Sequence, residues 1–167
     1  MAAALTSSVT VGSALGIFDA GVFSKIESAK GKMNMIRNNY VGAILSMLAL
    51  AICGLKGVSN LVGGNITMGA ITFFSGLVAK SVSFQFYQIP NLVTTTLFSE
   101  STSVALSFTD AVSFLVTAGV MGVSGLVVGN FGWSAAWAFM ALIFSLGATS
   151  TTKAVRPVVI KTTKNPR

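Results

Sequence analysis

The stretch from Ala111 to Thr152 contains no Asp, Glu, Lys or Arg, and it is too long for a single membrane-spanning helix. About 20 apolar residues are enough to cross the hydrocarbon core of a bilayer as an α-helix. The turn-forming segment Gly129 to Gly132 lies inside this stretch and divides it into two spans. Only 9% of the residues are charged and 53% are hydrophobic, too few charges to cover a soluble domain. The sequence therefore predicts an all-α, multi-pass transmembrane helical bundle.

Shorter charge-free runs place the other spans, at Met1 to Phe18, Asn38 to Leu55, Gly57 to Ala79 and Ser81 to Ser99. We expect about five helices, over residues 2–23, 41–58, 68–97, 102–128 and 133–150. They form one transmembrane domain, residues 1–152, and the polar, basic segment 24–40 is expected to be a loop in water. A basic tail follows over 153–167, where Pro157 and Pro166 argue against further helix.

The basic residues also predict an orientation, because Lys and Arg concentrate in loops on the inner side of a membrane. Five spans place the 24–40 loop and the 153–167 tail on the same side. These two segments carry most of the eleven Lys and Arg residues of the chain. The amino terminus is therefore expected outside and the carboxyl terminus inside; the thylakoid, inner mitochondrial and plasma membranes all fit this pattern.

The composition argues against several classes of function. The chain has no histidine, the commonest general base and metal ligand, and Cys53 is its only cysteine. No nucleophile and base pair or metal-ligand cluster stands out, so neither an enzyme nor a metal site is expected. The net charge of +7 lies at the edges of apolar runs, which does not indicate nucleic-acid binding. The expected partners are the lipid bilayer and other membrane subunits.

Lys80 lies near the middle of the helix predicted over 68–97, where an unpaired charge costs about 2.5–3.5 kcal/mol. It should face protein or a water-filled cavity, either as a binding site for an anionic solute or paired with Asp110 or with backbone carbonyls. A depth offset of roughly 15 Å makes a direct pair with Asp110 depend on a tilt or kink. Asp19, near the inner end of the first helix, is expected to meet Lys25 or lipid headgroups.

The inner half of the same helix has a polar face made by Gln85, Gln88 and Asn91 at helical spacing. With Lys80, these amides are candidate substrate-binding residues. The alternative is hydrogen bonding between helices, worth about 0.6–2 kcal/mol per contact. The same amides could also ligate a chlorophyll magnesium, and lipid, chlorophyll or carotenoid contacts are the only cofactor interactions that the sequence suggests.

Small residues recur at the spacings that allow helices to approach closely. One pair lies in the first helix, and a longer series lies in the helix predicted over 102–128. We expect these glycines to form helix-packing faces: Gly12, Gly16, Gly119, Gly122, Gly125 and Gly129.

The order of these parts resembles the last five transmembrane helices of a major facilitator superfamily transporter, over nearly all of the chain. The segment 21–25 followed by 30–32 stands where that family has a glycine, acidic, basic loop motif, with Ser24 in place of the acid. Ile89 to Asn91 ending a long helix, Glu100 in a short link and Phe131 to Trp133 opening the last helix resemble its organophosphate and anion transporters.

The resemblance implies a role for Lys80 in holding an anionic solute. Such transporters have twelve helices in two halves that rock around a midplane site, and this chain corresponds to less than one half. We therefore expect first a non-catalytic accessory subunit of a larger membrane complex, such as a photosynthetic or other energy-converting one. The alternative is the C-terminal part of a facilitator-type transporter for a small organic anion.

Overall fold

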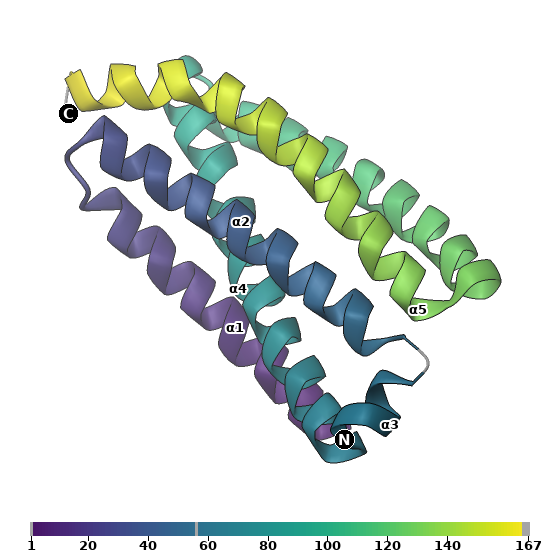
Figure 1. The fold of residues 1–167 in the computed structure, drawn as a ribbon. Helices are drawn as coiled ribbons and strands as arrows, with labels where there is room; N and C mark the ends of the chain where they lie inside the picture. The colour runs from purple at the N-terminus through teal and green to yellow at the C-terminus, as the bar shows by residue number, and fades with distance from the viewer. Residues whose placement is uncertain (1, 56, 165–167) are drawn as a thin grey trace.

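The computed structural model describes residues 2–55 and 57–164, and every element in this part of the chain is a helix (Figure 1). Four of the helices are long and apolar enough to cross a membrane, as expected for an integral membrane protein. The elements are α1 (Ala2–Ser24), α2 (Ala29–Cys53), α3 (Val58–Val62), α4 (Gly64–Leu97) and α5 (Thr102–Lys164).

Helix α5 is interrupted at Gly132, whose φ of 83° and ψ of 176° are not helical. This backbone conformation is open essentially only to glycine. The break separates a first half of α5, residues 102–131, from a second half, residues 133–164, which doubles back beside it (Figure 1). The bundle thus has five long helical segments in its described part, in agreement with the expected number. The start of α1 and the end of α5 lie at opposite ends of the bundle (Figure 1).

Helices α1 and α4 run parallel and touch through their backbones. A Cβ atom added at Gly12 would collide with the carbonyl oxygen of Gly76, and one added at Gly16 would collide with the carbonyl oxygen of Lys80. Close approach of this kind requires small residues on one helix at a spacing of four. The contact fixes α1 against the middle of α4, although the whole of α2 separates them in the sequence.

The prediction of a water-exposed loop over 24–40 is wrong for most of its length. Helix α2 begins at Ala29, where the hydroxyl oxygen of Ser28 accepts a hydrogen bond from the backbone N–H of Gly31 at 3.1 Å. Ile36 and Tyr40 are buried on this part of the helix. Apolar side chains one turn apart therefore hold the segment in the bundle, whereas its basic residues had suggested a loop.

The non-helical tail predicted from residue 153 onward is also wrong over the described residues. The second half of α5 continues through Pro157 to Lys164, and Val155, Val158 and Val159 are buried. These valines share one face at the spacing of a helix, so their burial outweighs the single backbone hydrogen bond that Pro157 removes. Residues 165–167 of the predicted tail lie outside the described part.

The ends of the middle helices also differ from expectation. Helix α2 ends at Cys53, five residues earlier than predicted, and the backbone N–H of Gly54 caps it by donating to the carbonyl of Leu50. Between α2 and α4, where no helix is predicted beyond residue 58, the chain forms the short helix α3 and then Gly63, which has a φ of 94°. Helix α4 then starts at Gly64 and keeps Pro90 within it.

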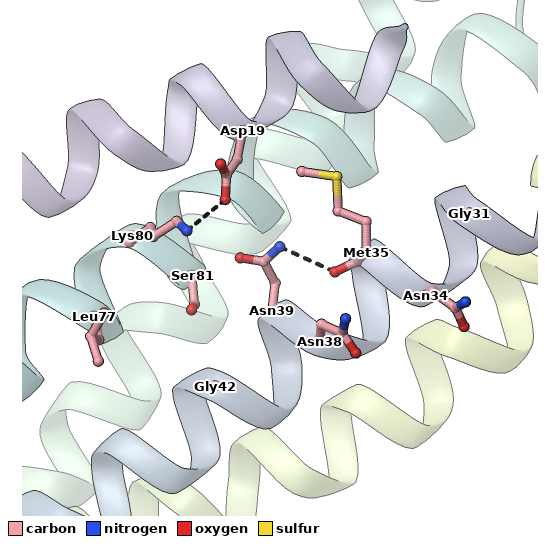
Figure 2. Close-up of a pocket in the computed structure, with 10 residues that line it drawn as sticks. All are labelled: Asp19, Gly31, Asn34, Met35, Asn38, Asn39, Gly42, Leu77, Lys80 and Ser81. Atoms are coloured by element: carbon pink, nitrogen blue, oxygen red, sulfur yellow. Dashed lines mark hydrogen bonds and ion pairs between the residues drawn. The ribbon is translucent and has the colours of Figure 1, made fainter. Parts of the chain in front are cut away.

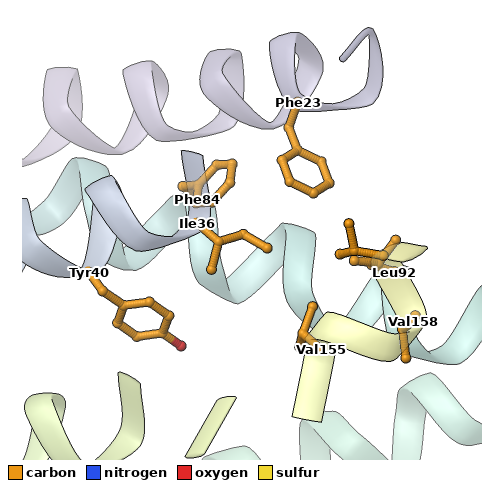
Figure 3. Packing of buried hydrophobic residues seen from close by; sticks show 8 residues of the cluster. Phe23, Ile36, Tyr40, Phe84, Leu92, Val155 and Val158 are labelled. Carbon is orange, nitrogen blue, oxygen red and sulfur yellow. The ribbon is translucent and has the colours of Figure 1, made fainter. Parts of the chain in front are cut away.

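The largest cluster of buried apolar residues lies at the end of the bundle where α1 ends and α2 begins (Figure 3). There the rings of Phe23 and Phe84 meet edge to face, with centroids 5.7 Å apart. Four of the five long segments contribute to this cluster, which comprises Phe23, Ile36, Tyr40, Phe84, Leu92, Val155, Val158 and Val159. The end of α5 thus closes this end of the bundle.

Candidate functional site

Lys80 and Asp19 form an ion pair between α4 and α1, with the Lys80 Nζ 2.9 Å from the Asp19 Oδ2 (Figure 2). The sequence suggested Asp110 as a partner for Lys80, and Lys25 or lipid headgroups as partners for Asp19. The difference arises because Gly16 brings α1 against the backbone of Lys80, and Asp19 follows Gly16 by about one helical turn. Its carboxylate therefore lies beside the ammonium group.

The pair lies at the wall of a pocket between α1, α2 and α4, which we call the Lys80 pocket (Figure 2). Its volume is about 480 Å³, within the range of sites for small molecules. The two side chains are only partly buried: the side chain of Lys80 is 33% exposed and that of Asp19 is 20% exposed. The remaining lining is Gly31, Asn34, Met35, Asn38, Asn39, Gly42, Leu77 and Ser81.

Three asparagines on α2 line the same pocket, and among them Asn39 lies nearest the charged pair (Figure 2). Asn39 donates through its Nδ2 to the carbonyl oxygen of Met35 at 3.1 Å, which leaves its amide oxygen available as an acceptor. Asn34 and Asn38 line the pocket one turn apart on the same face of α2. The pocket therefore offers one cation, one carboxylate and several neutral donors and acceptors, a set that suits a small polar solute with an anionic group.

Sequence reasoning did not find these asparagines. They fall in the segment 24–40, which is predicted to be a loop, so no helix face is expected there. The sequence does contain a signal for them. Asn34 and Asn38 are four residues apart, and so are Ile36 and Tyr40, which is the spacing of a helix with one polar and one apolar face.

Gln85 lies in a different pocket from Lys80. This second pocket, of about 260 Å³, lies between α2, α4 and both halves of α5, where Tyr40, Ser113 and Thr151 add hydroxyl groups. The Nε2 of Gln85 is buried and has no hydrogen-bond partner in the described part of the chain. The candidate binding residues Lys80 and Gln85 therefore line two separate pockets on different faces of α4.

The other predicted site residues lie outside both pockets. Gln88 is half-buried and Asn91 is exposed, and neither lines the pocket of Lys80 or that of Gln85. Asp110 is partly exposed on the first half of α5 and makes no ion pair with the described residues.

The two groups of predicted packing glycines have different surroundings. Gly12 and Gly16 lie in the contact between α1 and α4, whereas a Cβ atom added to any glycine of the second group would meet no atom within 4 Å. The first half of α5 therefore presents an open small-residue face, which comprises Gly119, Gly122, Gly125 and Gly129.

Within residues 2–55 and 57–164, no group of three or more His, Cys, Asp or Glu side chains is placed to hold a metal ion. Comparison of the chain with protein-family models, with curated proteins and with solved structures gives no match.

Proposed function

We propose that this chain is the solute-binding part of a membrane transporter, and that a small organic anion binds in the Lys80 pocket. The observation that carries the proposal is the ion pair of Lys80 and Asp19, which lies within the apolar helices and opens onto a polar pocket. Charged side chains in membrane spans are costly, and they commonly mark the path or the binding site of a solute.

The partial exposure of the pair favours binding over a purely structural role. Lys80 keeps a third of its side-chain surface open, so its ammonium group can still donate a hydrogen bond to a molecule in the pocket. An anionic solute would compete with Asp19 for the ammonium group. The amide oxygen of Asn39, which lies beside the pair, would accept a hydrogen bond from the solute (Figure 2).

The resemblance of the chain to the last helices of facilitator-type transporters points in the same direction. In this proposal the amino terminus is outside and the carboxyl terminus inside, since the basic ends of α2 and α5 share one end of the bundle. Epitope tags at the two termini of the chain in sealed membrane vesicles test the orientation. Protease should remove the two tags from opposite sides, and removal of both from one side would contradict it.

Binding tests the function directly. The full chain in lipid nanodiscs is titrated with radiolabelled inorganic phosphate and glycerol phosphate, with a neutral sugar as the comparison. We expect Lys80→Met to weaken binding of the anions about tenfold or more, the loss of one charge-assisted hydrogen bond, and Lys80→Arg to retain part of it. Lys25→Met, which removes a lysine outside the pocket, is the matched control. Equal binding by wild type and Lys80→Met would exclude this site.

The accessory-subunit hypothesis has its own supporting observation, the open face of the first half of α5. Phe108, Leu115 and Leu126 are about 70% exposed there, beside glycines at which an added Cβ atom would meet no atom within 4 Å. Gly122→Leu would leave the fold of this chain intact and block a partner helix. Loss of a stable high-mass complex on native electrophoresis, with unchanged thermal unfolding of the purified chain, would support a subunit; migration of wild type as a monomer would exclude it.

A further inference from the structure

Three basic side chains surround a separate pocket at the end of the bundle where α2 begins and α5 ends. Lys30 and Arg37 lie on α2, and Arg156 lies on the second half of α5. The pocket has a volume of about 400 Å³, and we call it the Arg156 pocket. Its other lining residues are Ala29, Met33, Asn34, Thr152 and Ile160.

The fold brings these cations together in two steps. Lys30 and Arg37 are about two helical turns apart and therefore share a face of α2. Burial of Val155 and Val159 in the apolar cluster holds the end of α5 against α2, and this places Arg156 over the same face. The arrangement depends on the helical course of residues 153–164.

Among residues 2–55 and 57–164, no carboxylate lines the Arg156 pocket, and the ion pair found in this part of the chain joins Lys80 to Asp19 elsewhere. Three like charges around one pocket repel one another, so an anion bound between them would relieve the repulsion. The amino-terminal end of α2, which begins at Ala29, adds its partial positive charge at the same place. The electrostatics of the pocket therefore favour an anion.

The pocket also has an apolar wall. Met33 is half-buried, and Ile160 is 38% exposed beside the cations. A free inorganic ion would gain nothing from these side chains, whereas a phospholipid carries its phosphate next to acyl chains. Basic pockets between transmembrane helices at the level of the headgroups have the chemistry that recognises such lipids.

We propose that the Arg156 pocket binds the phosphate of an anionic phospholipid, with Lys30, Arg37 and Arg156 around the phosphate and with Met33 and Ile160 along the acyl chains. This lipid site is independent of solute binding at Lys80, since the linings of the two pockets share only Asn34. A bound lipid would join α2 to the end of α5 from outside.

The test measures how much lipid stays bound to the purified full chain. Wild type is prepared in mixed vesicles of phosphatidylcholine and phosphatidylglycerol, extracted in mild detergent and examined by native mass spectrometry. We expect phosphatidylglycerol to be retained over phosphatidylcholine. The triple variant Lys30→Gln, Arg37→Gln, Arg156→Gln should lose this retention, by about fivefold for each charge removed and about a hundredfold in total.

The matched control is the triple variant Lys25→Gln, Lys153→Gln, Lys161→Gln, which removes the same charge outside the pocket. It should retain phosphatidylglycerol within about twofold of wild type, because screened exposed charges contribute little at a distance. Equal losses in the two triple variants would overturn the proposal in favour of diffuse charge attraction. Circular dichroism and thermal unfolding confirm that both variants are folded.

Free phosphate is distinguished from lipid in a second arm. Inorganic phosphate at millimolar concentration should leave bound phosphatidylglycerol in place, because it lacks the acyl chains that Met33 and Ile160 contact. Displacement of the lipid by inorganic phosphate would show a site for a free anion and overturn the lipid proposal. Met33→Ser should lower lipid retention without changing the pocket charge, and full retention in this variant would also contradict it.

Discussion

The carboxylate of Asp19 lies 2.9 Å from the ammonium group of Lys80, so two charges within the apolar helices of this chain neutralise each other across α1 and α4. The pair stands on a contact between backbones, that of Gly16 with Lys80. The ion pair therefore depends both on the two charges and on Gly16, which lets α1 approach α4 closely enough for the side chains to meet.

The two charges should be coupled energetically. We expect Asp19→Asn and Lys80→Met each to destabilise the chain, because each leaves the other charge without its partner, and the double variant to be less destabilised than the sum. A coupling energy of about 1 kcal/mol or more is expected from a double-mutant cycle of unfolding in detergent. Strict additivity of the two single changes would mean that the pair is not formed.

The contact of α1 with α4 should tolerate no side chain at Gly12. Gly12→Leu is expected to lower the free energy of unfolding by about 1–3 kcal/mol or to separate the helices, because the new side chain meets the backbone of Gly76. Gly21→Leu is the control, since nothing lies within 4 Å of a Cβ atom there. Thermal unfolding of both variants in the same detergent gives the comparison, and equal stabilities would contradict the close contact.

Alanine should affect stability differently at two nearby glycines of α5, Gly129 and Gly132. Gly132→Ala is expected to destabilise the chain by about 1–3 kcal/mol, because the backbone there has a φ of 83°. Gly129→Ala lies in helical backbone with open space around it, and is expected to be neutral or stabilising by up to about 1 kcal/mol. A destabilising Gly129→Ala with a neutral Gly132→Ala would place the break elsewhere.

The end of α5 should contribute to stability as part of the core. Val159→Ala removes two buried methyl groups and is expected to cost about 2 kcal/mol or slightly less. Val104→Ala makes the same change at a side chain that is 71% exposed, and should cost little in detergent. Denaturant unfolding measures both, and an unaffected Val159→Ala chain would mean that residues 153–164 do not pack on the bundle.

The sequence predicts the number of long helices well because the relevant signals are large and local. Charge-free runs identify the spans, and the glycines around residue 132 mark the break between the last two. The prediction of helices from the sequence fails in segments that contain both basic residues and apolar residues at helical spacing. Ile36 and Tyr40 share their helix with Lys30 and Arg37, and Val155 and Val159 share theirs with Arg156, so composition alone suggested loops where amphipathic helices are found.

The candidate site could be predicted only in part for a related reason. Lys80 stands out because a single charge in an apolar run is conspicuous, and its position needs no knowledge of packing. Its partner depends on which helices touch, and this is a tertiary property. Asp110 and Asp19 are equally conspicuous in the sequence, but only the close approach at Gly16 selects Asp19.

The parallel contact of α1 with α4 has a consequence for how the protein is made. Helix α1 packs mainly against α4, so during synthesis it leaves the ribosome and enters the bilayer before its principal neighbour exists. Asp19 must cross this interval without the ammonium group that later compensates it. The two charges can therefore neutralise each other only after the chain has been extended beyond Lys80.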